Sequence, residues 1–242
     1  MSVITGKGKN IKEQMKKQKQ QKEENKIDFK KVKINKDLKK EGDSVRVRLL
    51  TAEDFTTYES HGFYNKGIYT APCINPTGDG EQRCLFCEAS KFEGWEELAG
   101  KTRFLFAFFD IDAGIIRYID VSYTQGTSLM DDIEEFEDSI EDFAFTLKRS
   151  GTGTKTTYKL SPIMKLNAED KEKFNAGDGQ KVPEEFYEKV LYVKSTNQQA
   201  IDLENAGFDV EGLLGYTIVN EDQENEEAQE DKSEEVPPEK VF

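Results

Sequence analysis

The stretch from His61 to Cys87 contains the only histidine and all three cysteines of the 242-residue chain. They follow the order His-x11-Cys-x10-Cys-x2-Cys. Thiolate sulfur and imidazole nitrogen are donors that Zn²⁺ prefers, and a structural zinc site takes four such donors in a tetrahedron. We therefore predict that one structural zinc ion is held by His61, Cys73, Cys84 and Cys87.

A reduced cysteine pair beside an unrelated surface histidine is the competing interpretation, and it is common for an isolated Cys-x2-Cys. Here all four residues fall within 27 positions, which favours zinc. Four protein ligands leave no open position for a substrate or an activated water molecule. The spacing therefore predicts a structural site rather than a catalytic one.

One enzymatic interpretation exists, because zinc nucleobase deaminases also bind zinc through a histidine and a Cys-x-x-Cys. Those enzymes need His-x-Glu and Pro-Cys-x-x-Cys. In this chain Gly62 and Phe63 follow His61, and the residue directly before Cys84 is not a proline. The third cysteine would have no part in such an enzyme's zinc site. A second histidine and a P-loop pattern are also absent from the sequence. We expect no enzymatic activity.

The elements around these ligands read as a hairpin, a loop and a short helix. Asn65-Lys66-Gly67 predicts a hairpin turn, residues 74–83 a loop rich in proline, glycine and aspartate, and residues 87–98 a helix. Before them, Val45, Val47 and Leu49 alternate with two arginines, which predicts a strand with one buried face.

The second half of the chain predicts more strands and helices. Apolar runs predict strands at 103–111 and 115–123, with the phenylalanines of the first strand in the core, and a basic hairpin at 143–163. A helix capped by Thr127 or Ser128 should bury Leu129, Ile133, Phe136 and Ile140. Further helices are expected at 167–174, 183–193 and 198–214.

This order of elements predicts a mainly β fold with α elements (α+β). We expect a five-stranded Greek-key barrel of the OB type with the zinc subdomain inserted after the first strand; another small barrel is the alternative. The domains would be a disordered basic arm at 1–40, a core at 41–220 that includes the zinc subdomain at 58–98, and an acidic, disordered tail at 221–242.

The charges are distributed very unevenly. Residues 1–40 contain 14 lysines and 5 acidic residues, whereas residues 221–242 contain 10 acidic residues and 2 lysines. A basic arm, a globular middle and an acidic tail favour a protein that handles a polyanion, although two solubilising tails would look the same. The odd cysteine count, the lack of a long apolar run and the absence of a signal peptide predict a soluble, cytoplasmic protein.

The hairpin at 143–163 combines lysines and an arginine with a tyrosine and small hydroxyl residues. Cationic side chains for phosphate and aromatic rings for bases are what single-stranded DNA binding requires, although a solvated hairpin without a ligand is the alternative. The residues that we predict to contact phosphate are Arg46, Arg48, Lys66, Arg103, Arg117, Lys148, Arg149, Lys155 and Lys159. Those predicted to stack on bases are Tyr64, Tyr69, Tyr118, Tyr123 and Tyr158.

Motifs over residues 44–160 resemble the zinc-containing single-stranded-DNA-binding (helix-destabilising) proteins of T-even bacteriophages. The resemblance lies in His61-Gly62-Phe63, Lys66-Gly67-x-Tyr69, the three cysteines with nearly the same gaps, and the strand Val45-Arg46-Val47-Arg48-Leu49. The basic arm and the acidic tail match in character only. The family's short Lys/Arg-Ser/Thr motif is not evident in this arm, and the tail is shorter.

The resemblance implies an OB-fold groove that binds single-stranded DNA without sequence preference and is braced by the zinc subdomain. It also implies cooperative self-association through the arm, and a tail that competes with DNA and recruits replication, recombination and repair proteins. The tail residues expected to meet partners are Glu234, Glu235 and the terminal Phe242. A protein encoded by a phage would act in the host cytoplasm, and no membrane is expected among its partners.

A zinc-bearing protein-interaction or regulatory module that never coats DNA is the alternative function. Titration with oligo-dT at several salt concentrations separates the two hypotheses.

Overall fold

The computed structural model describes residues 29–80, 82–140 and 142–219, which form two compact units. The first unit contains the described residues of 29–56 and 104–190, and the second contains 57–103 and 191–219. Two strands, β2 (Phe55–Phe63) and β4 (Lys101–Asp110), each contribute residues to both units. Residues 1–28 and 220–242 lie outside the described residues, and with them most of the predicted basic arm and the tail residues Glu234, Glu235 and Phe242.

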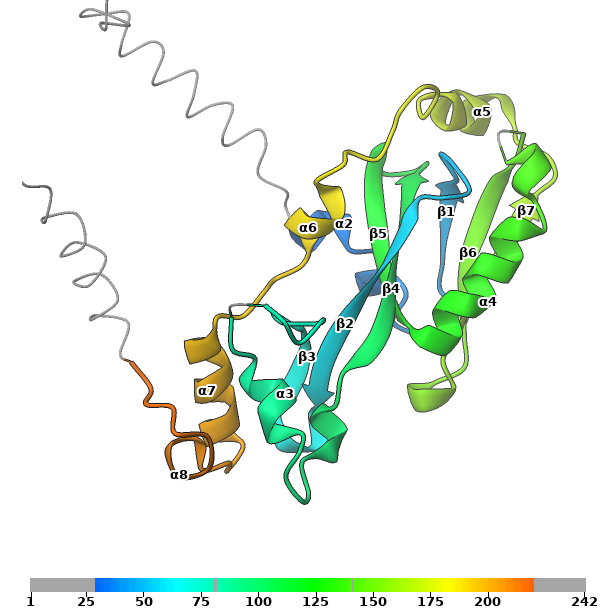
Figure 1. Cartoon of the computed structure of the whole chain (residues 1–242). Helices are drawn as coiled ribbons and strands as arrows, with labels where there is room; N and C mark the ends of the chain where they lie inside the picture. Colours follow the sequence, from blue (N-terminus) through cyan, green and yellow to red (C-terminus); the bar gives the residue numbers. More distant parts are fainter. Residues whose placement is uncertain (1–28, 81, 141, 220–242) are drawn as a thin grey trace, which may run out of the picture. The chain divides into compact units, whose positions relative to one another are not determined.

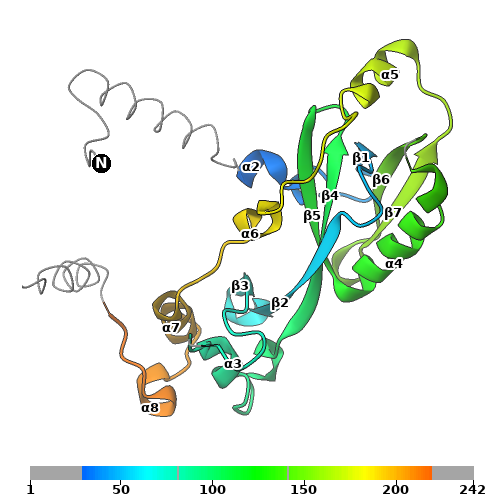
Figure 2. The same cartoon turned by 45° about the horizontal axis from the view of Figure 1, so that its top comes forward.

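A curled antiparallel sheet dominates the first unit (Figure 1), and Figure 2 shows the same sheet in a second view. Its order is β4, β1 (Ser44–Arg48), β6 (Ala144–Ser150) and β7 (Thr157–Ile163), and β5 (Ile115–Ser122) pairs with β4. The register sets Val45 opposite Leu147, and Leu147 opposite Leu160, so apolar side chains share one face. The helix α4 (Tyr123–Glu134) packs on β7 and adds Leu129 to this core.

Strand β4 is buried along its whole second half. The predicted core phenylalanines Phe104, Phe106 and Phe108 pack in the main core, as expected. Phe109 belongs to a second, smaller core with Phe174 of α5 (Ala168–Asn175). Because both faces of β4 are covered, its sequence is continuously apolar instead of alternating.

The folded part of the first unit begins earlier than the predicted boundary at residue 40. After α2 (Phe29–Val32), the side chains of Ile34 and Leu38 are fully buried in the main core. Ile34 begins a short 3-10 helix (Ile34–Lys36) and Leu38 follows that helix, so both apolar side chains reach the core from a lysine-rich segment.

The second unit joins a hairpin to three short helices. Strand β2 lies between β3 (Ile68–Pro72) and residues 101–103 of β4, and the predicted turn is made by Gly67, whose φ is 79°. The helices are α3 (Leu85–Ala89), α7 (Thr196–Asn205) and α8 (Val210–Leu214). Residues 191–219, which the sequence did not assign to the zinc subdomain, share its hydrophobic core.

The predicted strands and the helix capped by Asn167 are confirmed, but other helix boundaries were wrong. Helix α4 begins at Tyr123 because the Gln125 side chain accepts a hydrogen bond from the Ser122 backbone N–H. The helix expected at 198–214 is two helices, since Gly207 adopts a φ of 88° between them. Of the helix predicted at 87–98, only residues 87–89 are α-helical, as the end of α3, and of the helix predicted at 183–193 only α6 (Phe186–Val190) is α-helical. Among the described helices, none has the length and apolar character needed to cross a bilayer.

Candidate metal centre and basic face

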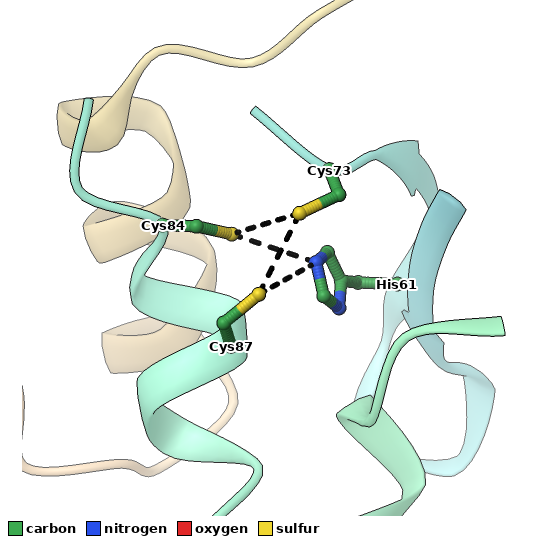
Figure 3. A group of neighbouring side chains, drawn as sticks. All are labelled: His61, Cys73, Cys84 and Cys87. Atoms are coloured by element: carbon green, nitrogen blue, oxygen red, sulfur yellow. Dashed lines mark hydrogen bonds between the residues drawn. The ribbon is translucent and has the colours of Figure 1, made fainter. Parts of the chain in front are cut away.

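The four residues predicted as metal ligands converge in the second unit (Figure 3). His61 lies on β2, Cys73 directly follows β3, Cys84 caps α3 and Cys87 lies within that helix. Their donor atoms all lie within 4.8 Å of one another, and the three cysteines form no disulfide. The cluster can therefore hold a metal ion.

Local structure explains the convergence. The β2–β3 register sets His61 opposite Ala71, which brings the imidazole close to the end of β3 and to Cys73. Helix α3 begins directly after Cys84, so Cys87 returns to the same side one helical turn later.

Four of the six separations between donor atoms are close to those around a tetrahedral ion. The Sγ atom of Cys73 lies 3.8 Å from that of Cys84 and 3.5 Å from that of Cys87. His61 Nε2 lies 3.5 Å from both of the latter sulfurs. Metal–sulfur bonds of about 2.3 Å and metal–nitrogen bonds of about 2.0 Å require sulfur–sulfur separations of about 3.8 Å and nitrogen–sulfur separations of about 3.5 Å.

The histidine is held in the tautomer that metal binding needs. His61 is buried, and its Nδ1–H donates to the Leu98 carbonyl oxygen at 2.6 Å. Because a carbonyl can only accept, Nδ1 carries a proton, and Nε2 is the ring nitrogen directed at the sulfurs of Cys84 and Cys87, where it could bind a metal.

The pKa values of the three thiols are shifted in different directions. A hydrogen bond with Cys87 lowers the pKa of Cys84, and the same hydrogen bond raises the pKa of Cys87. Burial raises the pKa of Cys73. For His61, burial lowers the pKa, but hydrogen bonds to Cys84 and to Leu98 outweigh it and leave the pKa raised. A bound cation would favour the deprotonated form of every ligand.

The two arginines of β1 are neutralised by carboxylates of the same unit. Arg46 donates to Asp112 at 2.5 and 3.0 Å and forms an ion pair with Asp170 at 2.8 Å. Arg48 is buried and donates to Asp178 at 2.5 Å. The predicted exposed arginine face is therefore partly covered by α5 and the turn that follows it.

Four further residues predicted to contact DNA have structural positions instead. Arg117 is buried, donates to Asp110 at 2.6 Å and also pairs with Asp37. Tyr118 and Tyr158 are only 5% and 7% exposed, so they do not offer a ring for base stacking. Tyr158 alternates with Lys159 on β7 and therefore faces the core. Its cross-strand neighbour Arg149 donates to the carbonyl oxygens of residues 38 and 39.

Other predicted residues do lie at the surface. Lys148, Lys155 and Lys159 are exposed on the β6–β7 hairpin of the first unit, as is Tyr123 at the start of α4. In the second unit Tyr64 is 66% and Tyr69 69% exposed, with their rings edge to face at 5.8 Å. Lys66 lies over the Trp95 ring at 4.4 Å, and Arg103 is partly buried on β4.

The sequence did not predict the residues that contact predicted site residues from far along the chain. Asp170 and Asp178 lie more than a hundred positions from the arginines that they pair with, and the buried Gln199 reaches Cys84. Helical periodicity marks Gln199 as a residue beside the apolar positions Ala200 and Leu203, but nothing local indicates its partner.

No protein-family model and no curated protein matches this chain.

Proposed function

We propose that this chain is a zinc-stabilised protein that binds single-stranded DNA without sequence preference. The observation that carries the proposal is the register of β1, β6 and β7. It sets Lys148 opposite both Ser44 and Lys159 on the outer face of the sheet, the face that Thr146 also shares. Cations and hydroxyl groups in neighbouring rows suit a phosphate backbone.

The lysine pair on this face is unfavourable without an anion. Lys148 and Lys159 stand directly opposite each other, and like charges in that position destabilise a sheet. Lys159 interacts electrostatically with the Asp132 carboxylate, but no ion pair within 4 Å joins either lysine to another described residue. A phosphate between them would relieve the repulsion, and its counterions would be released to solution.

Exposed tyrosines supply ring faces for bases. Tyr64 and Tyr69 in the second unit and Tyr123 in the first expose more than half of their surface. Stacking on such rings contributes about 1–3 kcal/mol per base and tolerates any sequence. Duplex DNA keeps its bases inside, so this mode of binding favours single strands.

Zinc is the metal that best suits the cluster. Three sulfurs and one imidazole nitrogen form a soft donor set, and their separations fit tetrahedral zinc. The protein supplies all four ligands, so the ion would stabilise the second unit and would not carry out catalysis.

The resemblance to the T-even phage family supports the finer parts of the proposal. The curled sheet is compatible with an OB-type Greek-key barrel. The protein would coat and protect single-stranded DNA in phage replication, recombination and repair, associate with itself along the strand, and meet partner proteins through its acidic tail.

A protein-interaction module remains the second candidate, because one pocket in the first unit suits a basic peptide. It has a volume of about 160 Å³ and is lined by Phe55, Met130 and Ile133, with Glu53 and Glu134 among its acidic neighbours. In such a peptide, an apolar side chain would contact the apolar lining of the pocket, and flanking lysines would pair with its glutamates.

Fluorescence titration with oligo-dT from 50 to 300 mM salt tests the proposal. We expect tight binding that weakens steeply with salt and differs little between oligo-dT and mixed sequences. The Lys148→Ala/Lys159→Ala variant should bind more weakly with a shallower salt slope. Lys181→Ala/Lys189→Ala, which removes two exposed lysines elsewhere in the first unit, is the matched control. Absence of binding at 50 mM salt with zinc present would refute the proposal.

A further inference from the structure

Helix α7 carries two buried amide side chains, Asn197 and Gln199, on its inner side. A buried amide must form hydrogen bonds, because leaving one unsatisfied costs about 1–3 kcal/mol. Both amides are satisfied, and their partners lie in different parts of the second unit. These partners link the metal centre to the C-terminal segment, defined here as residues 191–219.

Gln199 connects α7 to the cysteine turn, defined here as residues 83–88. Its side chain is fully buried, and its Oε1 accepts from the Phe86 backbone N–H at 3.4 Å. The same oxygen lies 3.5 Å from Cys84 Sγ, and Nε2 donates to the Lys194 carbonyl at 3.3 Å. When Cys84 is a metal-bound thiolate, the bond to Phe86 still fixes the peptide between the two cysteines.

Two further polar contacts join the cysteine turn to the C-terminal segment. The Thr196 hydroxyl donates to the Arg83 carbonyl at 3.0 Å, and the Arg83 guanidinium donates to the Leu214 carbonyl at 2.5 Å. Phe86 and Leu203 lie in the same hydrophobic core. The Cys-x-x-Cys and the helices α7 and α8 therefore form one packed body.

Asn197 fastens the end of that segment. Its Nδ2 donates to the Val219 carbonyl at 2.8 Å, and its Oδ1 accepts from the Val219 N–H at 2.9 Å. Val219 is the last described residue before the acidic sequence 220–242. Asn197 therefore holds Val219, close to the start of the acidic tail. Asn197 lies two positions before Gln199, the residue that contacts Cys84.

We propose that Gln199 is a positioning residue of the metal centre, and that metal binding fixes the C-terminal segment through it, including Val219 at the base of the acidic tail. The metal then has a second role besides stabilising the hairpin: it determines whether the base of the tail is ordered. The inference rests on metal binding by the four ligands and does not depend on DNA binding.

The first test replaces the amide while keeping its volume. In the full chain, Gln199→Met should bind Zn²⁺ about 10–100-fold more weakly in competition with a chromophoric chelator, as other outer-sphere variants do. Its Co²⁺ form should also show shifted absorption bands, because the cysteine turn relaxes. Leu203→Ala, a core truncation in the same helix, should lower thermal stability and keep the wild-type Co²⁺ spectrum.

The second test follows hydrogen exchange in the wild-type chain with zinc and after chelation. We expect amides of α7 and of Val219 to lose protection together with those of α3. Asn197→Ala should lose protection at Val219 while keeping wild-type zinc affinity, since Asn197 touches no ligand.

Wild-type zinc affinity and Co²⁺ bands in Gln199→Met would overturn the inference, and so would α7 amides that stay protected after chelation. A chain that binds no metal would overturn both this inference and the assignment of zinc. Loss of DNA binding with these metal effects intact would leave the inference standing and count against the proposed function alone.

Discussion

The guanidinium carbon of Arg48 lies 4.2 Å from the centre of the Phe174 ring, and Nη1 of the same arginine donates to the Phe174 carbonyl at 3.0 Å. A buried arginine that stacks on a ring and donates to a carbonyl and to Asp178 secures α5 to the sheet. Gly177 is required in this contact, because a Cβ there would lie 2.9 Å from the Phe109 ring and 3.2 Å from Arg48 Cδ. Arg48 is thus a structural residue.

Arg48→Ala should lower the free energy of unfolding by roughly 2–3 kcal/mol, since it removes a ring contact and charged hydrogen bonds. Urea unfolding measures the loss. Arg48→Met, which keeps an apolar stem against Phe174, should lose less. DNA affinity of the folded Arg48→Ala protein should stay near wild type; a loss as large as that of the Lys148/Lys159 variant would contradict the structural role.

Asp170→Asn should strengthen single-stranded DNA binding several-fold. It removes one of the two carboxylates that neutralise Arg46, a partly exposed arginine on the same face of the sheet as Lys148. Asp131→Asn, an exposed position on α4, changes the net charge equally and controls for long-range electrostatics. Equal gains from both variants in the same titration would show that Arg46 has no special part.

The tyrosines should separate into two groups. Tyr69→Ala should weaken DNA binding by about 1–3 kcal/mol and leave the melting temperature unchanged, because the ring is exposed. Tyr158→Ala should instead cost about 3–5 kcal/mol of stability, as a large truncation in a packed core does. Thermal melts and DNA titrations on both variants test this; a Tyr158→Ala protein with wild-type stability would contradict the assignment of that ring to the core.

Metal removal should destabilise the second unit. A zinc ion at the proposed site would compete with protons for three thiols and one imidazole, so its affinity should fall as the pH falls and binding should release protons. Calorimetry in buffers of different ionisation enthalpy counts those protons. Cys87→Ser should reduce affinity strongly, whereas Ser90→Ala, near the same helix, should not; equal affinity in the two variants would refute the ligand set.

Asp132 gives a pH dependence whose sign can be stated. Burial raises the pKa of this carboxyl, while the Leu160 N–H that it accepts acts in the opposite direction. Since the folded-state pKa lies above the unfolded value, the stabilisation is present below the unfolded value of about 3.9 and is lost as the pH rises through the folded-state pKa. Asp132→Asn should therefore be more stable than wild type at neutral pH and gain nothing at low pH. Chemical unfolding at both pH values checks this, with Asp131→Asn as the control for net charge.

Local patterns in the sequence predicted what short-range physics controls. Alternation predicted β1, β5 and the β6–β7 hairpin, and the continuous run of phenylalanines predicted the buried strand β4. The start of α4 was less predictable, because three residues near it can act as an N-cap: Ser122, Thr127 and Ser128. Only the position of the preceding strand makes Ser122 the cap.

The sequence by itself identified the cluster that can hold a metal ion, because His61, Cys73, Cys84 and Cys87 are the only residues of their types and lie close along the chain. The tertiary structure decided which cations and rings face solvent. Asp170 and Asp178 neutralise Arg46 and Arg48, Tyr158 fills the core, and Gln199 reaches Cys84 from a helix 115 positions away. These relationships depend on side chains brought together by folding, and no local spacing encodes them.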